Sequence, residues 1–265
     1  MATKIADRQL LTAPGGGAAS DLLSPLTGAE VSVTTTTTLT LFGRLHVCTG
    51  TSANYTVTLP AASGNAGKMI GVRMASTLTK LVTIDAGTGV LIDGQQTRIL
   101  WAQETATLMS DGTGWVKLNG KSRAMFCRLR LSAATATAQG ISTATMTVVQ
   151  HDAADDPTGL MANLTTWRIT AQRPGTYQII PATNFNFGFT ASRVLTRAII
   201  NGGSDYGGEV GVGNSSSFAA VTWPMTFMLS ATDFVTHAAY QTSGGTQQLY
   251  GSSLNFLSIL ETPAW

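Results

Sequence analysis

The side chains that could carry out chemistry in this sequence are few and scattered. The three histidines are His46, His151 and His237, and none lies in an HExxH motif or near a GxSxG serine. Most of the 14 acidic residues stand singly in predicted turns, and no pair of carboxylates is placed for glycoside hydrolysis, which needs a separation of about 5–9.5 Å. His46 and His237 fall within strand patterns, where we expect hydrogen-bonded sheet residues. The sequence therefore argues against an enzyme.

The densest group of acidic residues directly follows His151. Asp152, Asp155 and Asp156 lie close together, and carboxylate oxygens are ligands that calcium prefers. Their spacing matches no EF-hand, so a solvated acidic loop is the favoured interpretation and a calcium site is the alternative. No other cofactor is expected.

Residues 201–208 are predicted to form a glycine-rich loop that exposes an aromatic ring. Tyr206 has little apolar sequence around it that could cover it. An aromatic face beside Asn201 and Asp205 suits a sugar, because sugar C–H groups stack on the ring and the hydroxyls find polar partners. The alternative, equally supported, is that Tyr206 packs against a neighbouring subunit. A second polar and aromatic group surrounds the turn at residues 243–245 and comprises Gln241, Gln247, Gln248 and Tyr250.

The composition narrows the class of protein. Charged residues make up only 11% of the chain, well under the ~25% of ordinary globular proteins. Thr, Ser, Asn, Gln and Gly must therefore supply the polar surface, as is common in extracellular fibres. The net charge of +2 gives no electrostatic footprint for nucleic acid. Cys48 and Cys127 form no metal-binding pattern, and two buried free thiols are favoured over a disulfide.

The pattern of apolar residues predicts an all-β protein. Short strands follow one another with Gly, Ser and Asp clusters between them, and no long helical pattern separates them, which indicates a β-sandwich or barrel. Residues 193–200 read as a strand that ends in the turn signal Asn201-Gly202-Gly203. The alternating residues Phe185, Phe187 and Phe189, and the terminal Trp265, are assigned to packing.

Three segments are expected along the chain. Residues 1–30 contain a Gly-rich stretch and are expected to form an extended arm. Residues 31–122 form a small β-sandwich or barrel, and residues 123–265 form a further β domain. The N-terminus lacks the apolar core of a signal peptide, and no run approaches the ~20 apolar residues of a membrane span. We therefore expect synthesis in a cytoplasm and release by lysis.

Three motifs occur in order between residues 58 and 118: TLPAASGNAGK, IDG and ETATLMSDGTGWVKL. With them, this segment resembles a module of tailed-phage tail-fibre and head-fibre proteins. Trp115 is expected to close one end of the sandwich as a packing residue. The positions expected to supply positive-φ turns are Gly64, Gly67, Gly94, Gly112 and Gly114.

Residues 123–265 resemble the globular head of the C1q and tumour-necrosis-factor superfamily. The most family-like parts are the Pro174-Gly175-Thr176-Tyr177 turn, the segment ATDFV at 231–235 and the segment QTSGG at 241–245. The family usually has Gly where this chain has Thr232. The resemblance implies a jelly roll that forms a compact homotrimer. Several such heads bind calcium, which would favour Asp152, Asp155 and Asp156 as ligands.

Together the two resemblances imply a fibre or head spike of a tailed phage, or of a phage-like particle such as a gene transfer agent. The arm would attach to capsid or tail proteins through Ile5, Leu10 and Leu11, and the first β domain would form a stalk. The trimeric head would bind host-surface polysaccharide through many weak copies. We expect a location on the particle surface, after synthesis in the bacterial cytoplasm, with no membrane insertion. The alternatives are a purely structural capsid-decoration or tail-adaptor protein, a small depolymerase, and a secreted signalling ligand, against which the missing signal peptide argues.

Overall fold

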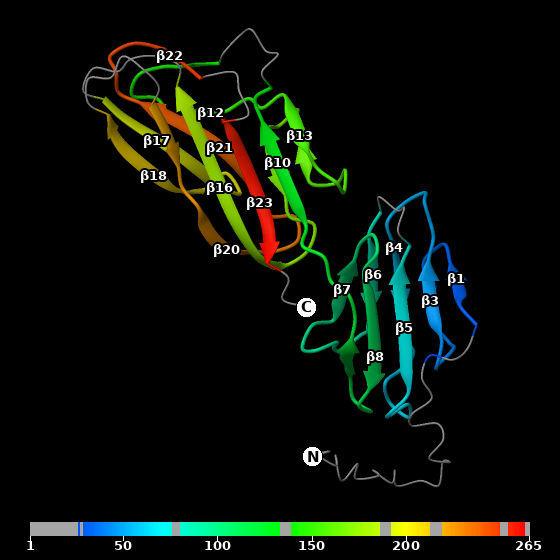
Figure 1. The fold of residues 1–265 in the computed structure, drawn as a ribbon. Coiled ribbons are helices and arrows are strands. Elements are labelled where there is room, and N and C mark those ends of the chain that lie inside the picture. The colour runs from blue at the N-terminus through cyan, green and yellow to red at the C-terminus, as the bar shows by residue number, and fades with distance from the viewer. Residues whose placement is uncertain are drawn as a thin grey trace, which may run out of the picture. The chain divides into compact units, whose positions relative to one another are not determined.

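The computed structural model describes residues 26, 29–75, 80–132, 139–185, 192–212, 219–249 and 254–262. Every regular element of these residues is a β-strand, which confirms the all-β prediction for them. The described part of the chain has no helix that is long and apolar enough to span a membrane. The chain divides into two compact units, residues 1–121 and 122–265 (Figure 1). The proposed anchoring residues Ile5, Leu10 and Leu11 lie outside the described residues.

The first unit contains two sheets, ordered β1-β3-β5-β8-β9 and β2-β4-β6-β7. Alternate residues are buried in β4 and β6 of one sheet and in β8 of the other, as at Val57 and Leu108, so the sheets pack face to face. The strands are β1 (Val31–Val33), β2 (Thr37–Thr38), β3 (Leu45–Cys48), β4 (Tyr55–Thr58), β5 (Met69–Met74), β6 (Val82–Asp85), β7 (Thr97–Leu100), β8 (Thr105–Ser110) and β9 (Trp115–Asn119).

The first three strands of each sheet are parallel, which the sequence analysis did not predict. The chain passes alternately between the sheets, so that β1, β3 and β5 pair side by side, as do β2, β4 and β6. This is the winding of a short β-helix, closed by the antiparallel strands β7, β8 and β9. The hydroxyl of Tyr55 in β4 donates to Val33 O in β1 at 3.0 Å and so links the two sheets.

The turns of this unit largely match the sequence prediction. Of the five glycines expected at positive φ, Gly64, Gly67, Gly94 and Gly112 have φ between 75° and 94°. Gly114 is the exception: an added Cβ would lie 2.9 Å from Leu91 O, so close backbone approach requires glycine there. Trp115 is buried and stacks on Phe42 with ring centroids 6.5 Å apart, which confirms its packing role.

The second unit contains two larger sheets. The principal strand orders are β13-β10-β23-β16-β19, with β20 also on β16, and β14-β15-β21-β17-β18, with β12 on β21. The strands are β10 (Phe126–Arg130), β11 (Gly140–Ile141), β12 (Thr147–Val148), β13 (Ala153–Asp155), β14 (Ala162–Asn163), β15 (Arg168–Thr170), β16 (Gly175–Phe185), β17 (Ser192–Ile200), β18 (Ser204–Val212), β19 (Ala219–Thr222), β20 (Met225–Leu229), β21 (Phe234–Gln241), β22 (Gln247–Gln248) and β23 (Phe256–Thr262).

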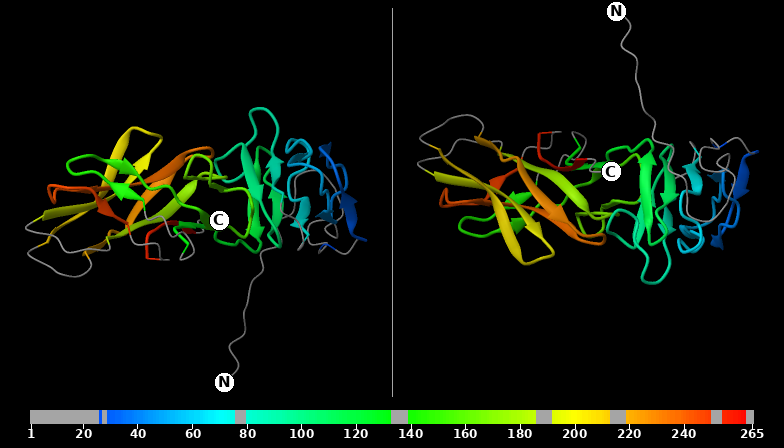
Figure 2. Two further views of the ribbon diagram at one scale, coloured as in Figure 1. Left: turned by 90° about the horizontal axis from the view of Figure 1, so that it is seen from above. Right: turned by 90° about the horizontal axis from the view of Figure 1, so that it is seen from below.

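The order of these strands is that of a jelly roll. The first strand β10 lies beside the last strand β23, and β15 lies beside β21, so the chain crosses repeatedly between two antiparallel sheets. Figures 1 and 2 show the two layers. Between them is a core that includes Phe185, a packing residue as predicted; Phe187, Phe189 and Trp265 lie outside the described residues.

A buried ion pair fastens the end of the jelly roll at which the chain enters. Arg173 Nε and Nη2 each donate to the Glu261 carboxylate at 2.7 Å. The same carboxylate accepts the backbone N–H of Met125 at 3.0 Å, and Arg173 Nη2 also donates to Arg123 O at 2.6 Å. The Tyr177 hydroxyl donates to Arg173 O at 2.9 Å. The Pro-Gly turn and the first and last strands of this unit are therefore held at one point.

Thr232, where the C1q-like pattern has Gly, adopts a backbone conformation that β-branched residues avoid. Its φ is 78°, in the left-handed region. The turn is kept in place by neighbouring hydrogen bonds: Thr232 N donates to Ala171 O at 2.8 Å, and Ser230 N donates to the Asp233 carboxylate at 2.7 Å. Thr232 is exposed, so its side chain contributes little that would offset the strain.

Thr232→Gly should therefore stabilise the second unit. Relief of about 1–2 kcal/mol of left-handed strain outweighs the extra chain entropy of glycine in the unfolded state, about 0.4–1 kcal/mol. We expect the free energy of unfolding to rise by about 0.5–1 kcal/mol, measured by urea denaturation. The control Thr166→Gly replaces an exposed turn threonine without positive φ, and it should lower the free energy of unfolding. If both variants are destabilised alike, the strain at Thr232 is not significant.

Candidate binding surfaces

The segment at residues 201–208 is not the open loop that the sequence predicted. Only residues 201–203 form a turn, and β18 begins at Ser204, so Asp205 and Tyr206 lie on a strand paired with β17. Asn201 is held by its own hydrogen bonds: Nδ2 donates to Asp233 Oδ1 at 2.8 Å and Oδ1 accepts Phe234 N at 2.9 Å. Its side chain therefore fixes the start of β21.

Asp205 and Tyr206 point to opposite faces of their sheet, because successive strand residues alternate. Tyr206 pairs with Ala198, whose side chain is fully buried between the sheets. Asp205 lies on the outer face, where its carboxylate is 3.8 Å from Arg197 Nε. The predicted sugar site of Asn201, Asp205 and Tyr206 is therefore not assembled as one surface.

Tyr206 instead belongs to an aromatic group at the open edge of the sandwich. Its ring lies 4.4 Å from that of Phe227 in β20, on the opposite sheet. Trp223, between β19 and β20, packs against Gly208 of β18, where an added Cβ would lie 2.5 Å from the Trp223 ring. Tyr206 is 38% exposed and Trp223 is 49% exposed. We call Tyr206, Trp223 and Phe227 the edge patch.

A second group of apolar side chains lies on the outward side of the sheet that contains β10, β23, β16 and β20, among polar residues such as Arg128 and Gln178. On β23 the alternate residues Leu257, Ile259 and Glu261 are buried, so Leu260 faces outward and is 41% exposed. Met228 of β20 is 80% exposed, the highest value among the large apolar residues described. The outward apolar residues, called the outer-face patch, are Phe126, Ile180, Met228, Phe256 and Leu260.

The acidic run does not form a shared cation site. The carboxylate of Asp156 accepts the backbone N–H groups of Thr158, Met161 and Ala162, as well as the Thr158 hydroxyl. Asp152 accepts from the backbone and hydroxyl of Ser132, and Asp155 pairs with Arg130 at 3.3 Å. In the described part of the chain no three His, Cys, Asp or Glu side chains converge as metal ligands.

Gln247 and Gln248 lie at the end of the jelly roll opposite to Asn201. They form β22, which pairs with Gly140 and Ile141 of β11. Gln247 Nε2 donates to Ser243 Oγ at 2.9 Å, and Gln241 beneath them is fully buried and donates to Ile141 O and Gly245 O. Tyr250, the fourth member of the predicted group, lies outside the described residues.

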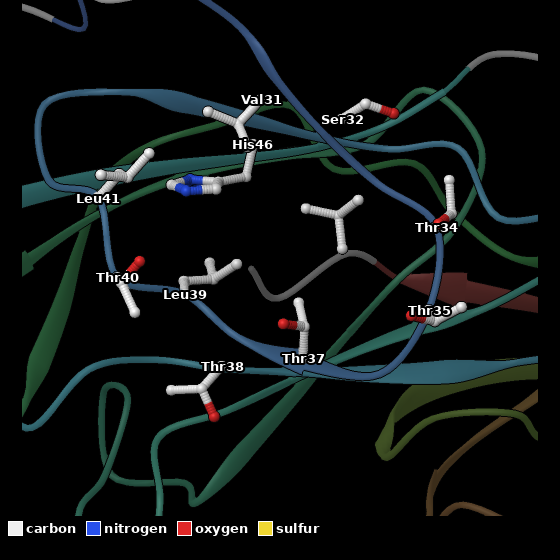
Figure 3. A pocket seen from close by; sticks show the side chains of 11 residues that line it. Val31, Ser32, Thr34, Thr35, Thr37, Thr38, Leu39, Thr40, Leu41 and His46 are labelled. Carbon is white, nitrogen blue, oxygen red and sulfur yellow. The ribbon is translucent and has the colours of Figure 1, made fainter.

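The first unit has a hollow of about 290 Å³. Its wall consists mostly of hydroxyl and apolar side chains, with one imidazole, from His46 (Figure 3). His46 Nδ1 lies 3.3 Å from Gly71 O, and burial lowers the pKa of its imidazole, so the wall is uncharged at neutral pH. Thr34, Thr35, Thr37 and Thr38 line one side of the hollow, around the two-residue strand β2.

The two thiols and His237 are buried. Cys48 and Cys127 are free, as predicted, and burial raises the pKa of the Cys48 thiol to about 11. Burial also raises the pKa of Cys127. His237 lies in β21 and is hydrogen-bonded, as predicted. The surfaces described above bring no nucleophile and base together.

Trp223 and Met228 were missed by reasoning from the sequence. Met228 could have been found, because the alternation of Met225, Phe227 and Leu229 as the inward face leaves Met228 on the other face. Trp223 could not, since its exposure depends on Gly208, which is distant in sequence and becomes its neighbour only at the sheet edges.

Comparison with known proteins yields likeness to solved structures alone: no family model and no curated relative matches the chain. Eiger TNF from S. frugiperda is 10% identical with a TM-score of 0.39, over 54% of this chain and 94% of that one. The globular domain of zebrafish complement 1qA is 13% identical with a TM-score of 0.36, over 54% and 98%. Murine APRIL is 14% identical with a TM-score of 0.37, over 53% and 100%. Because all three scores lie below 0.5, the jelly-roll assignment rests on the strand order.

Gly208→Ala tests the packing of the edge patch. The added methyl group would collide with the Trp223 ring, so the ring must move or the strands must separate, at a cost of about 1–3 kcal/mol in the free energy of unfolding. Urea denaturation and a changed Trp223 fluorescence environment measure this. Gly245→Ala is the matched control, since nothing lies within 4 Å of its added Cβ. A Gly208→Ala variant as stable as this control would contradict the described packing.

Proposed function

We propose that this protein is an adhesive fibre or spike component of a phage or phage-like particle. Its jelly-roll unit assembles as a homotrimer and binds host-surface polysaccharide, and the N-terminal segment attaches it to other virion proteins. The single observation that carries the proposal is the presence of two separate exposed apolar surfaces on one jelly roll, the edge patch and the outer-face patch.

The two patches differ in shape and position, which favours a head-to-tail contact between copies. The edge patch presents Tyr206 and Trp223 at the open side of the sandwich, and the outer-face patch presents Met228 and Leu260 on a sheet. When unlike surfaces of identical subunits meet, the contact repeats from copy to copy, and it closes into a ring where the rotation between copies is a whole fraction of a turn. A ring of three would cover both patches of every copy. Exposed apolar surfaces of this kind mark protein contacts.

Assembly of several copies supports adhesion because several weak binding sites that act together bind more tightly than one. Three copies on one stalk engage a repeating polysaccharide together, and the apparent affinity then exceeds that of a single site. With the edge patch used between subunits, the polar end at Gln247 and Gln248 remains for the sugar. Gln247, Ser243 and the nearby Thr143, whose hydroxyl accepts Gly244 N at 3.1 Å, supply amide and hydroxyl groups there.

The assignment to a particle draws on the sequence motifs between residues 58 and 118 and on the low content of charged residues. The parallel winding of the first unit is a further support. Its backbone hydrogen bonds run from coil to coil, so each coil is held by its neighbours, as in other proteins built from stacked coils.

Met228→Asp tests the assembly. A carboxylate on the outer-face patch would be buried without a partner at the contact, so we expect a single-copy mass by size-exclusion chromatography with light scattering, against three copies for the natural chain. Trp223→Ala should weaken assembly as well. Leu164→Asp is the control, because Leu164 is 39% exposed but belongs to neither patch. A natural chain that is monomeric at micromolar concentration would refute the trimer.

The double variant Gln247→Ala/Gln248→Ala tests the receptor contact separately. It should stay trimeric but lose retention on purified host polysaccharide, whereas Gln96→Ala, an exposed glutamine of the first unit, should be retained normally. If the trimer is not retained in any form and its removal leaves particle adsorption intact, the protein is a structural decoration or adaptor. Release of reducing sugar ends by the purified trimer would instead indicate a depolymerase.

A further inference from the structure

Two histidines that play no part in the proposed binding surfaces are buried together inside the jelly roll. His237, in the middle of β21, is completely buried, and His151, in the connection between β12 and β13, is 2% exposed. Their rings stack with centroids 5.3 Å apart, and His237 Nδ1 lies 3.3 Å from His151 Nε2. The connection is fixed at this point because Val149 N donates to His237 O at 2.9 Å.

The other ring nitrogen of His237, Nε2, contacts one threonine from the opposite sheet and one from the sheet to which His237 belongs. Its Nε2 lies 2.9 Å from Thr183 Oγ1 of β16 and 3.0 Å from Thr196 Oγ1 of β17, and the Thr183 hydroxyl donates to Thr196 at 2.9 Å. The cluster of His151, His237, Thr183 and Thr196 thus joins the two sheets through the interior. A threonine hydroxyl works with either tautomer of a neutral imidazole.

Only one hydrogen atom fits between His237 Nδ1 and His151 Nε2. At 3.3 Å one nitrogen must donate and the other must accept, so two fully protonated rings would place two N–H donors against each other. On its other side His151 Nδ1 is buried without a hydrogen-bond partner. A proton added to the pair would therefore put a charge in the core that no hydrogen bond to His151 Nδ1 stabilises, and burial of charge is costly.

The charged groups around the pair are few. The carboxylate of Asp152, next to His151, raises the pKa of that histidine, but burial has the larger effect and lowers it to about 3. Burial, followed by the charge of His151, lowers the pKa of His237 well below 6.5. Cys127, on the inward side of β10, is buried with a raised pKa and stays neutral. The Arg173–Glu261 pair lies at the end of the sheets where Met125 enters.

We propose that the His151–His237 pair is an acid-sensitive switch that keeps the two sheets together at neutral pH and releases the β12–β13 connection when the surroundings become mildly acidic. Opening exposes both imidazoles to water, where each takes up a proton that the closed core excludes. The proton is thus a ligand of the open form alone.

The direction of the effect follows from the depressed pKa values. In the open or unfolded state the histidines titrate near 6.5, and in the closed state they stay neutral to far lower pH. The contribution of the histidine pair to the free energy of opening is therefore fully present above pH 6.5 and is lost progressively as the pH falls below it. From pH 7 to pH 5 the opening equilibrium should rise about 25-fold for each histidine exposed, and on the order of 600-fold for both. Most carboxylates titrate below this window.

Hydrogen-exchange mass spectrometry of the full chain at pH 7 and pH 5, corrected for intrinsic exchange rates, tests the switch. Peptides that cover residues 147–155 and β21 should lose protection by the factors above. In the double variant His151→Gln/His237→Gln, which keeps polar groups but cannot titrate, the pH dependence in these peptides should vanish. The control His46→Gln removes the buried histidine of the first unit and should leave it unchanged.

Equal loss of protection in the double variant, or no loss in the natural chain, would overturn the proposal. If the double variant fails to fold, NMR of the imidazole C–H groups in the natural chain decides the question. Both resonances should stay in the neutral position down to pH 5 for as long as the unit is folded. A titration of either ring near pH 6.5 in the folded protein would refute the switch, whether or not the protein binds polysaccharide.

Discussion

The jelly-roll unit depends on the buried pairing of Arg173 with Glu261, because this pair joins the places where the chain enters, turns and leaves. The carboxylate holds the guanidinium in a two-point contact and also accepts the backbone of Met125. Buried ion pairs add little net stability over well-packed apolar residues, but loss of one partner costs about 3–5 kcal/mol. The pair is best understood as specifying which ends of the chain meet. Strand β23 can then lie between β10 and β16 in the register that buries Leu257 and Ile259.

The Arg173–Glu261 pair closes the sandwich at one end, but the two sheets do not join along the side at which β18 and β20 lie. Strands β18 and β20 are edges of different sheets, and the gap between them is filled by Tyr206 against Phe227 and by Trp223 against the bare backbone of Gly208. Aromatic rings fill the gap but remain partly in water. In the proposed trimer, the rings that complete the fold of one copy would also contact a second copy, so that folding and assembly would use the same residues.

Polar groups in the interior of the jelly roll specify how its two sheets are placed, whereas the aromatic residues at its edge fill a gap between them. The hydroxyls of Thr183 and Thr196 satisfy His237 from two sheets, which fixes how the sheets face each other. Such a network specifies one arrangement only while every member keeps its partner. Because histidines can take up protons, the hydrogen bonds of the His151–His237 pair depend on pH. The hydroxyl groups of the surface do not titrate and are not sensitive to pH in this way. The sensitive element is therefore confined to the core.

The sequence by itself determined the strand content, most turns and the burial of residues such as Phe185 and Trp115, because alternation and glycine act over a few neighbouring residues. The resemblance of residues 123–265 to C1q-like heads, which rests on the Pro174-Gly175 turn and its neighbours, also implied a jelly roll. The sequence could not decide strand direction: the parallel winding of β1, β3 and β5 joins residues at irregular spacings, and alternation specifies a face but not a partner. Nor could it place Asp205 and Tyr206, which lie next to each other on β18 and therefore point to opposite faces of the sheet. Only the tertiary structure brought Trp223 to Gly208 and His151 to His237, since these contacts depend on how distant strands stack.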